Sequence, residues 1–433
     1  QEEEPSARAT QEIDKSLEMY TDSNDLLANL AFMEATSTGG NGGITANHLK
    51  LAPIEVLDIL LPITDACFLG IFPKLFKRGI VLGIAKSDSR FRPITLLEVP
   101  YKLVTGTVNR RIMEVLFKHN MIRTNQYGNL IGGSTTTPLR MTITIHEQAK
   151  ANKSNVFSAY LDLASAFDTI PHNFLEAAVK QITGSSKLAR WIRNLSHDHT
   201  RIMQSAHGIG PEEEEVGLTG GCPQGDPISP LMLVFVQELL MRALLKESGP
   251  GIKVGKTNVV QQCFVDDVHC ADTTFKGLEK TCISLTLLYA AIGCRINFSK
   301  CFLTSTKPSF TLTKQEMGVI GLGTDGILRK RTMTSVPLRP SKETDMANKK
   351  KSTATDRGAA RYLGAWFSHY CELDENAQEW TEQAAVLDAA LERFSSHAQK
   401  ITPSMPNYVD IVNSHFVSRM ISILQTARLE KIA

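Results

Sequence analysis

Two adjacent aspartates and a third one upstream are the residues of this sequence best suited to chemistry. Asp266 and Asp267 stand between two short apolar stretches in QQCFVDDVHCA, which predicts a hairpin with carboxylates at its tip. Asp162 ends another apolar run of strand type. Adjacent carboxylates repel each other unless a cation neutralises them. If the two strands are neighbours, the three acids converge on one spot.

Carboxylate oxygens grouped in this way suit Mg²⁺, which also binds substrate phosphates. Two such ions about 4 Å apart can activate a 3′-hydroxyl and stabilise a pyrophosphate leaving group. A lone Asp–Asp pair is more often an ordinary polar hairpin tip. The D-x-x-x-A-F-D spacing from Asp162 to Asp168 is more specific.

A Gly- and Pro-rich segment, GCPQGDPISPLM, lies between these two acidic segments in the chain. It predicts a turn that enters a helix over 231–245. Its glycines allow a ligand or another backbone to approach closely. The segment VFSAYLDLASAFDTIPH predicts a strand that switches to a helix near Asp168 and Pro171.

Basic residues gather upstream of the acids. Residues 71–123 contain eleven Lys and Arg against three Asp and Glu, a net charge of +8. Within them, Lys86, Arg90 and Arg92 lie in a short strand-like stretch. Cations spaced so closely in a strand favour binding of an anion over the ordinary alternative, a helix face exposed to solvent. The four acids at 212–215 predict a solvent-exposed loop or hairpin tip.

The remaining segments supply the surrounding elements. Residues 1–70 read as mostly helical, with a Gly-rich loop over 36–45 before a helix that starts near Thr45. This loop lacks the Gly-Lys-Ser/Thr of a phosphate-binding P-loop. The apolar run 56–76 contains two Asp and two Pro, so we expect a buried pair of short helices and not a membrane span. From about Glu379 onward the sequence predicts further helices.

Composition is that of an ordinary globular protein. The 433 residues are 42% hydrophobic and carry a formal net charge of +2, which excludes a disordered polyelectrolyte and a uniformly basic coat for nucleic acid. The average hides a polarised chain, because the +8 segment is offset by acids elsewhere. The eight cysteines form no C-x-x-C pair. They indicate buried, reduced thiols in a nuclear or cytoplasmic protein.

Taken together, these segments resemble a reverse transcriptase of the non-LTR (LINE-type) retrotransposon group. DLASAFD resembles the first palm motif of that family, GCPQGDPISPLM its Gln-Gly motif and FVDD its aromatic-x-Asp-Asp motif. The resemblance runs from about Thr36 to Phe367. Its other carriers are GGNGGITANHLKL, RFRPITLLEVPYKLVTGTVNRRI, NQYGNLIGGSTTTPL, GCRINFSKC and RYLGAWF.

The resemblance implies a role for each matching residue. The metal-binding aspartates are Asp162 and Asp266, with Asp267 as a less essential neighbour and the Leu163 carbonyl completing the coordination. Phe167 would clash with a 2′-hydroxyl and so favour dNTPs; its ordinary alternative is a core aromatic. The other implied roles are nucleotide and template contact by Gln224 and Gly225, triphosphate contact by Lys86, Arg90 and Arg92, proton donation to pyrophosphate by Lys300, and primer support by Tyr362, Leu363 and Gly364.

Two positions depart from the family pattern. Asn129 stands where Phe is usual, which puts the packing of the template strand in doubt, and Val265 stands where Ala is commoner. The resemblance implies an α+β right-hand polymerase with an antiparallel palm sheet. We expect these divisions: an N-terminal helical extension over 1–70, fingers over 71–155, palm with the catalytic motifs over 156–304, the rest of the palm with a basic loop and primer grip over 305–370, and a helical thumb over 371–433.

The expected function is RNA-directed DNA synthesis by two-metal nucleotidyl transfer. The expected cofactor is Mg²⁺, two ions, with Mn²⁺ as the alternative. The expected partners are an RNA template, a DNA primer or target and dNTPs, in a ribonucleoprotein and away from membranes. By family analogy the synthesis is target-primed. One alternative is a domesticated polymerase fold that serves as an RNA-binding scaffold. Another, a viral RNA-directed RNA polymerase, fits Phe167 and Phe264–Val265 less well.

Overall fold

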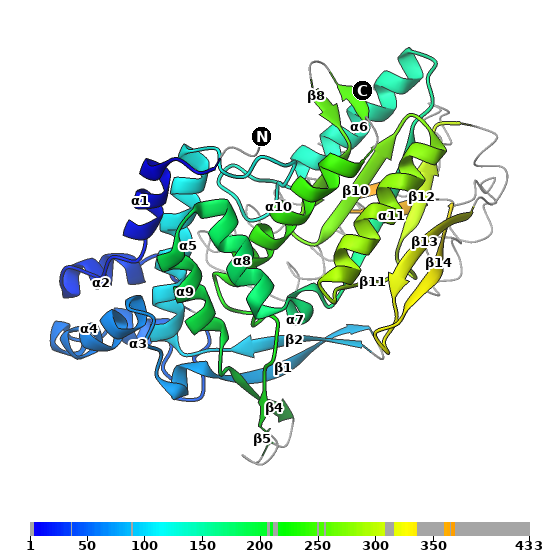
Figure 1. The fold of residues 1–433 in the computed structure, drawn as a ribbon. Helices are drawn as coiled ribbons and strands as arrows, with labels where there is room; N and C mark the ends of the chain where they lie inside the picture. The colour runs from blue at the N-terminus through cyan, green and yellow to red at the C-terminus, as the bar shows by residue number, and fades with distance from the viewer. Residues whose placement is uncertain are drawn as a thin grey trace, which may run out of the picture. The chain divides into compact units, whose positions relative to one another are not determined.

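The computed structural model describes residues 4–35, 37–87, 90–205, 208–210, 215–248, 251–254, 257–307, 316–335, 359–363 and 365–368. Helices and separate, mainly antiparallel sheets make the fold α+β (Figure 1). The chain forms two compact units. The first unit comprises Gln1–Gly132, Ala164–Ala243 and Leu288–Arg295, and the second comprises Gly133–Leu163, Leu244–Leu287 and Ile296–Ala433.

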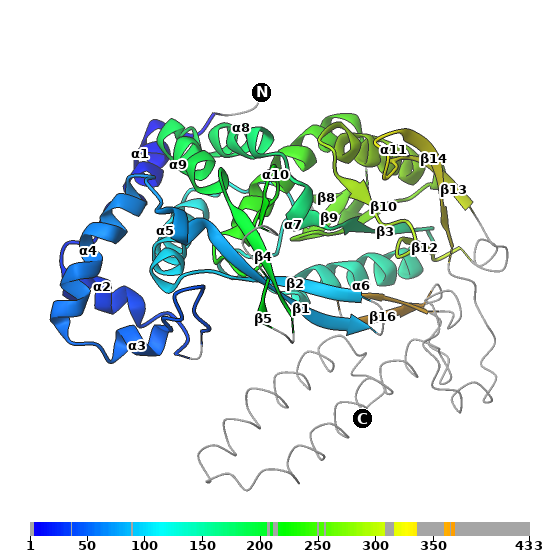
Figure 2. The same ribbon diagram turned by 90° about the horizontal axis from the view of Figure 1, so that it is seen from below.

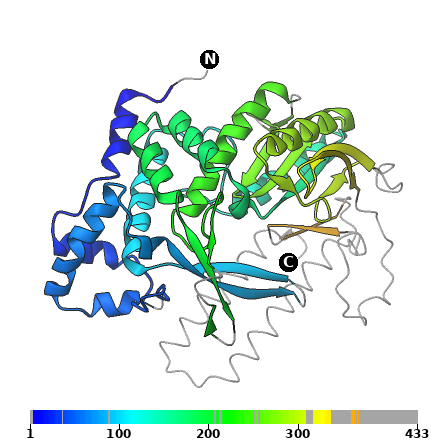
Figure 3. The same cartoon turned by 60° about the horizontal axis from the view of Figure 1, so that its bottom comes forward.

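The first unit begins with four helices, as the sequence predicts. They are α1 (Ala7–Lys15), α2 (Ser23–Leu30), α3 (Ala46–Lys50) and α4 (Ile54–Phe68), drawn in blue in Figure 3. The helix expected near Thr45 is confirmed, because the Thr45 side chain caps α3 by accepting from the His48 amide.

The expected pair of buried short helices over 56–76 is wrong. Residues 54–68 form one helix with Pro62 inside it, followed by the short 3₁₀ helix η1 (Lys74–Lys77). A proline within a helix removes one hydrogen bond and can bend the helix without ending it. Fewer residues of this helix are buried than expected. Leu57 and Phe68 face the core, whereas Ile59 is 69% exposed, because only one stripe of α4 packs inward.

The first unit also contains a five-stranded sheet (Figure 2). Strands β1 (Arg78–Ser87) and β2 (Arg90–Leu96) form an antiparallel hairpin, and β1 also pairs in parallel with β4 (Thr200–Ser205). Two short strands, β5 (Gly208–Ile209) and β6 (Val216–Gly217), pair with β4. The strand-like stretch expected around Lys86 and Arg92 is therefore confirmed as the two arms of one hairpin.

The acid run at 212–215 is only partly described. Glu215 is half-buried and its Oε2 lies 3.0 Å from the Arg78 Nε, so the expectation of a solvent-exposed acid is wrong at this position. The other three acids lie outside the described residues.

Four further described helices lie in the first unit, and a fifth starts there and ends in the second unit. They are α5 (Val99–Lys118), α7 (Ala166–Thr169), α8 (His172–Thr183), α9 (Ser186–Ser196) and α10 (Ser229–Glu247). The predicted strand-to-helix switch near Asp168 is confirmed by α7 and α8. The helix predicted over 231–245 is confirmed by α10.

The second unit is built on another five-stranded sheet. Its strand order is β11-β3-β10-β9, and β12 pairs with β3. The bounds are β3 (Phe157–Ala164), β9 (Gln261–Phe264), β10 (Asp267–Asp272), β11 (Arg295–Ile296) and β12 (Phe302–Ser305). We call it the palm sheet. The predicted hairpin around Asp266 is confirmed, since β9 and β10 are antiparallel neighbours.

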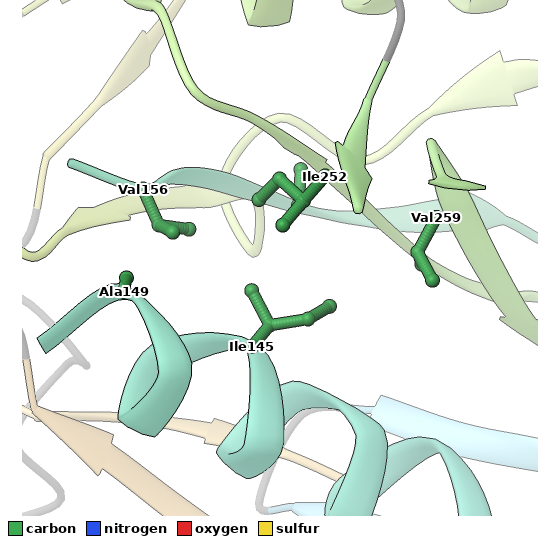
Figure 4. Packing of buried hydrophobic residues seen from close by; sticks show 6 residues of the cluster. Ile145, Ala149, Val156, Ile252 and Val259 are labelled. Carbon is green, nitrogen blue, oxygen red and sulfur yellow. The ribbon is translucent and has the colours of Figure 1, made fainter. Parts of the chain in front are cut away.

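Helix α6 (Thr136–Ala151) packs beside this sheet. Figure 4 shows Ile145 and Ala149 of α6 directed toward Val156, Ile252 and Val259. The last two belong to the hairpin β7 (Ile252–Val254) and β8 (Thr257–Val259). All five side chains are less than 10% exposed, so this apolar layer fixes α6 beside the palm sheet.

The second unit also contains two further hairpins and helix α11 (Phe275–Ala291). The hairpins are β13 (Glu316–Leu322) with β14 (Leu328–Thr334), and β15 (Ala359–Tyr362) with β16 (Ala365–Ser368). The expected helical thumb over 371–433 lies outside the described residues.

Two expectations about the whole chain can be compared with the described part. Seven cysteines are buried and none of these seven is in a disulfide, as expected; Cys371 lies outside the described residues. Within the described residues, no helix combines the length and the apolar character needed to cross a membrane.

Candidate active site

Strand pairing places two of the aspartates directly opposite each other. In the antiparallel pair of β3 and β10, Asp162 stands opposite Asp267. Asp266 precedes Asp267 in the two-residue connection between β9 and β10, whose last pair is Phe264 with Asp267. The expectation that the acidic strands are neighbours is therefore confirmed. Directly opposite carboxylates on one sheet disfavour the fold unless positive charge compensates them.

The connection that carries Asp266 is strained. Val265 has φ +56°, in the left-handed region that β-branched residues rarely adopt. Such a conformation costs on the order of 1–3 kcal/mol and persists only where the surroundings enforce it. Here the pairing of β9 with β10 enforces it, and the tight turn keeps Asp266 next to the end of the sheet.

Lys300 supplies positive charge to Asp162. Its Nζ lies 2.9 Å from one Asp162 carboxylate oxygen and 2.7 Å from the other. The side chains of Lys300 and Asp162 are 39% and 25% exposed. An ion pair in such contact with water is worth about 1 kcal/mol or less. A divalent cation could therefore displace the ammonium at little cost.

The oxygen donors at this end of the palm sheet fit a hard divalent cation. Asp162, Asp266 and Asp267 offer carboxylates, and the Leu163 carbonyl adjoins Asp162 in the chain. Among the described residues, no three His, Cys, Asp or Glu side chains form a ready-made metal cluster. The Asp162 carboxylate lies against Lys300 instead.

The turn between β11 and β12, residues 297–301, holds Asp162 from the backbone side. The Asn297 amide donates to the Asp162 carbonyl oxygen over 2.8 Å. The Asp162 amide donates to Cys301 Sγ over 3.5 Å. Sequence reasoning assigned no role to Asn297 or Cys301. Their contacts could not be read from it because they join positions about 135 residues apart in the chain.

A second group of predicted residues lies within the first unit. Phe167 is half-buried in α7, and its carbonyl oxygen accepts from the Cys222 amide over 2.6 Å. The Gly221 amide donates to the Ile170 carbonyl over 2.7 Å. Gly221 has φ +82°, and a Cβ there would lie 2.6 Å from the Phe167 carbonyl oxygen. Only glycine allows this approach of the two turns.

The Gln-Gly motif is joined to β2 by the same kind of contact. The Thr95 amide donates to the Gln224 carbonyl over 2.6 Å. Gly225 has φ +128°, and a Cβ there would lie 2.4 Å from the Thr95 carbonyl oxygen. Gln224 and Gly225 are therefore tied to the strand that carries Arg92, which is exposed. Thr95 is a supporting residue that sequence reasoning missed.

Asp226 anchors this motif from the inside. It is 3% exposed, and its carboxylate accepts from the Tyr101 hydroxyl over 2.6 Å and from the Ile228 amide over 3.2 Å. Burial raises the pKa of Asp226 above its usual range. Burial also raises the pKa of Tyr101. The predicted motif contained Asp226, but only the fold reveals that it is a buried anchor.

The remaining predicted residues are described in part. The backbones of Lys86 and Arg90 lie on β1 and β2 near the end of their hairpin, while their side chains lie outside the described residues. Tyr362 ends β15, and Leu363 has φ +46° in the tight turn to β16. Gly364 and the Tyr362 side chain also lie outside the described residues.

Asn129, one of the two departures from the family pattern, has a local explanation. Its φ is +50°, a left-handed conformation that Asn tolerates better than bulky residues do. The backbone at this position therefore favours Asn over Phe.

Comparison with known proteins agrees with this geometry. Residues 84–366, more than half of the chain, match the family described as "Reverse transcriptase (RNA-dependent DNA polymerase)". The chain therefore belongs to the reverse transcriptase family, and it has the α+β polymerase fold of that family.

Curated relatives come from non-LTR retrotransposons. The chain is 27% identical over 277 residues to the Pol polyprotein of retrotransposable element R2DM of Drosophila melanogaster, covering 63% of this chain and 25% of the relative. It is 23% identical over 218 residues to that of element R2 of Popillia japonica, covering 50% of this chain and 30% of the relative. The chain thus spans about a quarter to a third of the length of these relatives. Among solved structures, apo telomerase from Candida tropicalis, truncated from its C-terminal domain, aligns with a TM-score of 0.43 and 14% identity over 59% of this chain and 55% of that chain.

His199, beside the Tyr101–Asp226 pair, makes stability depend on pH. Burial, and next the positive charge of Lys77, lower the pKa of His199 from 6.5 to about 4. Between these two values the unfolded chain binds more protons than the folded one, so the free energy of unfolding falls as pH is lowered from 6.5 to 4. The full difference is worth roughly 3 kcal/mol.

We expect His199→Gln to flatten this loss, measured as the free energy of unfolding in urea at pH values from 6.5 to 4. The control is His48→Gln at an exposed position, where Gln also serves in a helix capping box. The control should keep the wild-type slope. A wild-type slope in His199→Gln would contradict a neutral, buried His199.

Proposed function

We propose that this protein is an RNA-directed DNA polymerase that extends a DNA primer along an RNA template. The observation that carries the proposal is the pairing of Asp162 with Asp267 across neighbouring strands, with Asp266 adjacent in the turn. Family membership supports it. The scaffold alternative predicts that these acids have no chemical task, although they impose repulsion and turn strain on the fold.

Reverse transcriptases as a family use divalent metal ions. We propose that two Mg²⁺ ions, or Mn²⁺ in their place, bind the carboxylates of Asp162, Asp266 and Asp267 and the carbonyl of Leu163. When bound, such ions lower the barrier by favouring the ionised primer hydroxyl and the departing pyrophosphate. The chain's own contribution is to hold these oxygens at the end of a rigid sheet.

Other residues would bind and orient the substrates. Lys86, Arg90 and Arg92 would contact the triphosphate, which Arg can hold with two parallel hydrogen bonds. Phe167, fixed by the contact between its carbonyl and the Cys222 amide, would exclude a 2′-hydroxyl. Gln224 and Gly225 would line the nucleotide and template base. Tyr362, Leu363 and Gly364 would support the primer end.

Lys300 would take part at two stages. Its Nζ pairs with Asp162 in the structure, and the same ammonium would hold the proton that the leaving pyrophosphate accepts. Release of Lys300 from Asp162 would then accompany binding of the cations to the carboxylates. The modest strength of an exposed ion pair is compatible with this exchange.

The wider setting is also a proposal. Similarity to parts of non-LTR retrotransposon proteins supports target-primed synthesis with an RNA template and a DNA target. A ribonucleoprotein setting away from membranes is part of the same proposal. The division into an N-terminal extension over 1–70, fingers over 71–155, palm over 156–370 and thumb over 371–433 belongs to the same proposal. Seven buried thiols support a reducing compartment, nuclear or cytoplasmic.

Removing one carboxylate should abolish synthesis. We expect Asp266→Asn to lower dNTP incorporation on a primed RNA template at least 100-fold, because a neutral amide is a poor ligand for Mg²⁺. Incorporation is measured by extension of a labelled DNA primer. The control is Asp198→Asn, an exposed position with φ +57°, where Asn adopts the same conformation readily.

Full activity of Asp266→Asn would overturn the assignment of this acid. Absence of incorporation by the wild-type protein with every primer, template and metal tested would favour the scaffold alternative. In that case RNA binding should be the same for the wild-type protein and Asp266→Asn.

Phe167 should control the choice of sugar. We expect Phe167→Val to raise the ratio of rNTP to dNTP incorporation by about 10- to 100-fold, because a smaller side chain leaves room for the 2′-hydroxyl. Single-nucleotide incorporation with matched rNTP and dNTP measures the ratio. Phe174→Val, at another half-buried phenylalanine of the same unit, should leave it unchanged. An unchanged ratio in Phe167→Val would exclude the steric role.

A further inference from the structure

The hairpin of β13 and β14 contacts the turn that carries Lys300. Along β13, Met317, Val319 and Gly321 are buried while the residues between them are less so, and this inner face is turned toward the protein. At Gly321 the nearest side chain is the Phe298 ring. Phe298 belongs to the turn 297–301, two residues before Lys300.

The contact leaves no room for a side chain at Gly321. A Cβ there would lie 2.5 Å from Phe298 Cε2 and 2.7 Å from Cζ, and 3.2 Å from Arg331 Cγ. Real Cβ contacts are essentially never shorter than 3.0 Å. Gly321 lies in regular strand with no positive φ, so the glycine is required by the close approach of the ring and not by the backbone conformation.

The contacts already described attach the turn 297–301 to Asp162. Asn297 and Cys301 bond the backbone of Asp162, and Lys300 pairs with its carboxylate. Inside the turn, the Lys300 amide donates to the Asn297 carbonyl over 2.9 Å. These bonds connect the turn to β3 from one side. The contact of the Phe298 ring with Gly321 connects the turn to the β13–β14 hairpin as well.

We propose that Gly321 is a positioning residue: the β13–β14 hairpin, through the Phe298 ring, fixes the turn 297–301 so that the Lys300 ammonium reaches Asp162. A methyl group at Gly321 displaces the ring by about 0.5 Å before the shortest normal contact is restored. Functional groups need to be held to about that tolerance. The consequence for activity rests on the proposed function, whereas the consequence for the turn does not.

Two variants on the same strand test this inference. Gly321→Ala places a methyl group against the Phe298 ring. The control is Gly318→Ala, where the nearest atom is the Cε of the exposed Lys330 side chain at 3.0 Å, and that flexible side chain can move aside. Both changes replace glycine by alanine on one strand, so their effects on strand propensity match, while only Gly321→Ala meets the Phe298 ring.

Cys301 reports on the turn without requiring activity. It is 8% exposed, and burial raises the pKa of its thiol to about 12. Alkylation by iodoacetamide, followed by peptide mass spectrometry, measures how often the turn opens. We expect Gly321→Ala to raise the alkylation rate of Cys301 at least 5-fold and Gly318→Ala to leave it unchanged. Cys67, fully buried in the first unit, is the internal control in each digest.

The second measurement is kcat and KM for dNTP incorporation. We expect Gly321→Ala to lower kcat about 10-fold with little change in KM, since displacement of Lys300 affects the chemical step. In a Lys300→Gln background, Gly321→Ala should lower kcat almost no further, because the effect of Gly321 on kcat acts through the Lys300 ammonium.

Unchanged Cys301 alkylation and unchanged kcat in Gly321→Ala would overturn the inference. An equal loss of kcat with and without Lys300 would show a merely structural role and would also overturn it. If the wild-type protein shows no incorporation, the proposed function fails by itself, and the alkylation of Cys301 still decides the positioning of the turn.

Discussion

The structure depends on a strand pairing that sets two aspartates opposite each other at the end of one sheet. The pairing of β3 with β10 sets Asp162 opposite Asp267, and the turn before β10 adds Asp266. Lys300, whose ammonium lies against the Asp162 carboxylate, compensates part of the repulsion between these groups. The like charges and the left-handed Val265 both lower the stability of the fold at this point.

Close backbone contacts elsewhere fix the segments that carry Phe167, Gln224 and Lys300. In the first unit, Gly221 brings the turn of the Gln-Gly motif against the Phe167 carbonyl, and Gly225 brings it against Thr95. In the second unit, Gly321 brings a hairpin against Phe298. In each case a Cβ would collide with its neighbour, so absence of a side chain is the physical requirement. Rigid support of this kind is what precise orientation of reacting groups needs.

Much of this arrangement could be predicted from the sequence. The two short apolar stretches around the acidic pair predicted the β9–β10 hairpin, and the apolar run ending at Asp162 predicted the strand that pairs with it. The Gly- and Pro-rich segment predicted the turn before α10. Each of these features is local, because a short stretch of sequence contains the signal that predicts it.

Contacts between distant positions could not be predicted in this way. No local signal links Lys300 to Asp162, Thr95 to Gln224 or Gly321 to Phe298, because each contact depends on how whole elements pack. A buried pair of short helices was expected over 56–76, but residues 54–68 form one helix with Pro62 inside it, because a proline can bend a helix without ending it. Glu215 was expected in solvent, but tertiary structure places it against Arg78.

The central claim is that Asp162 and Asp266 bind the same cations. The most direct test is to measure Mn²⁺ binding to the protein in the absence of nucleic acid and nucleotides. Electron paramagnetic resonance can follow Mn²⁺ titrations of the wild type, Asp162→Asn, Asp266→Asn and the double variant. If the two acids hold the same ions, each single variant weakens binding, and the double variant loses clearly less than the sum of the two losses. Losses that add fully, or binding that is unchanged in both single variants, would contradict a shared site.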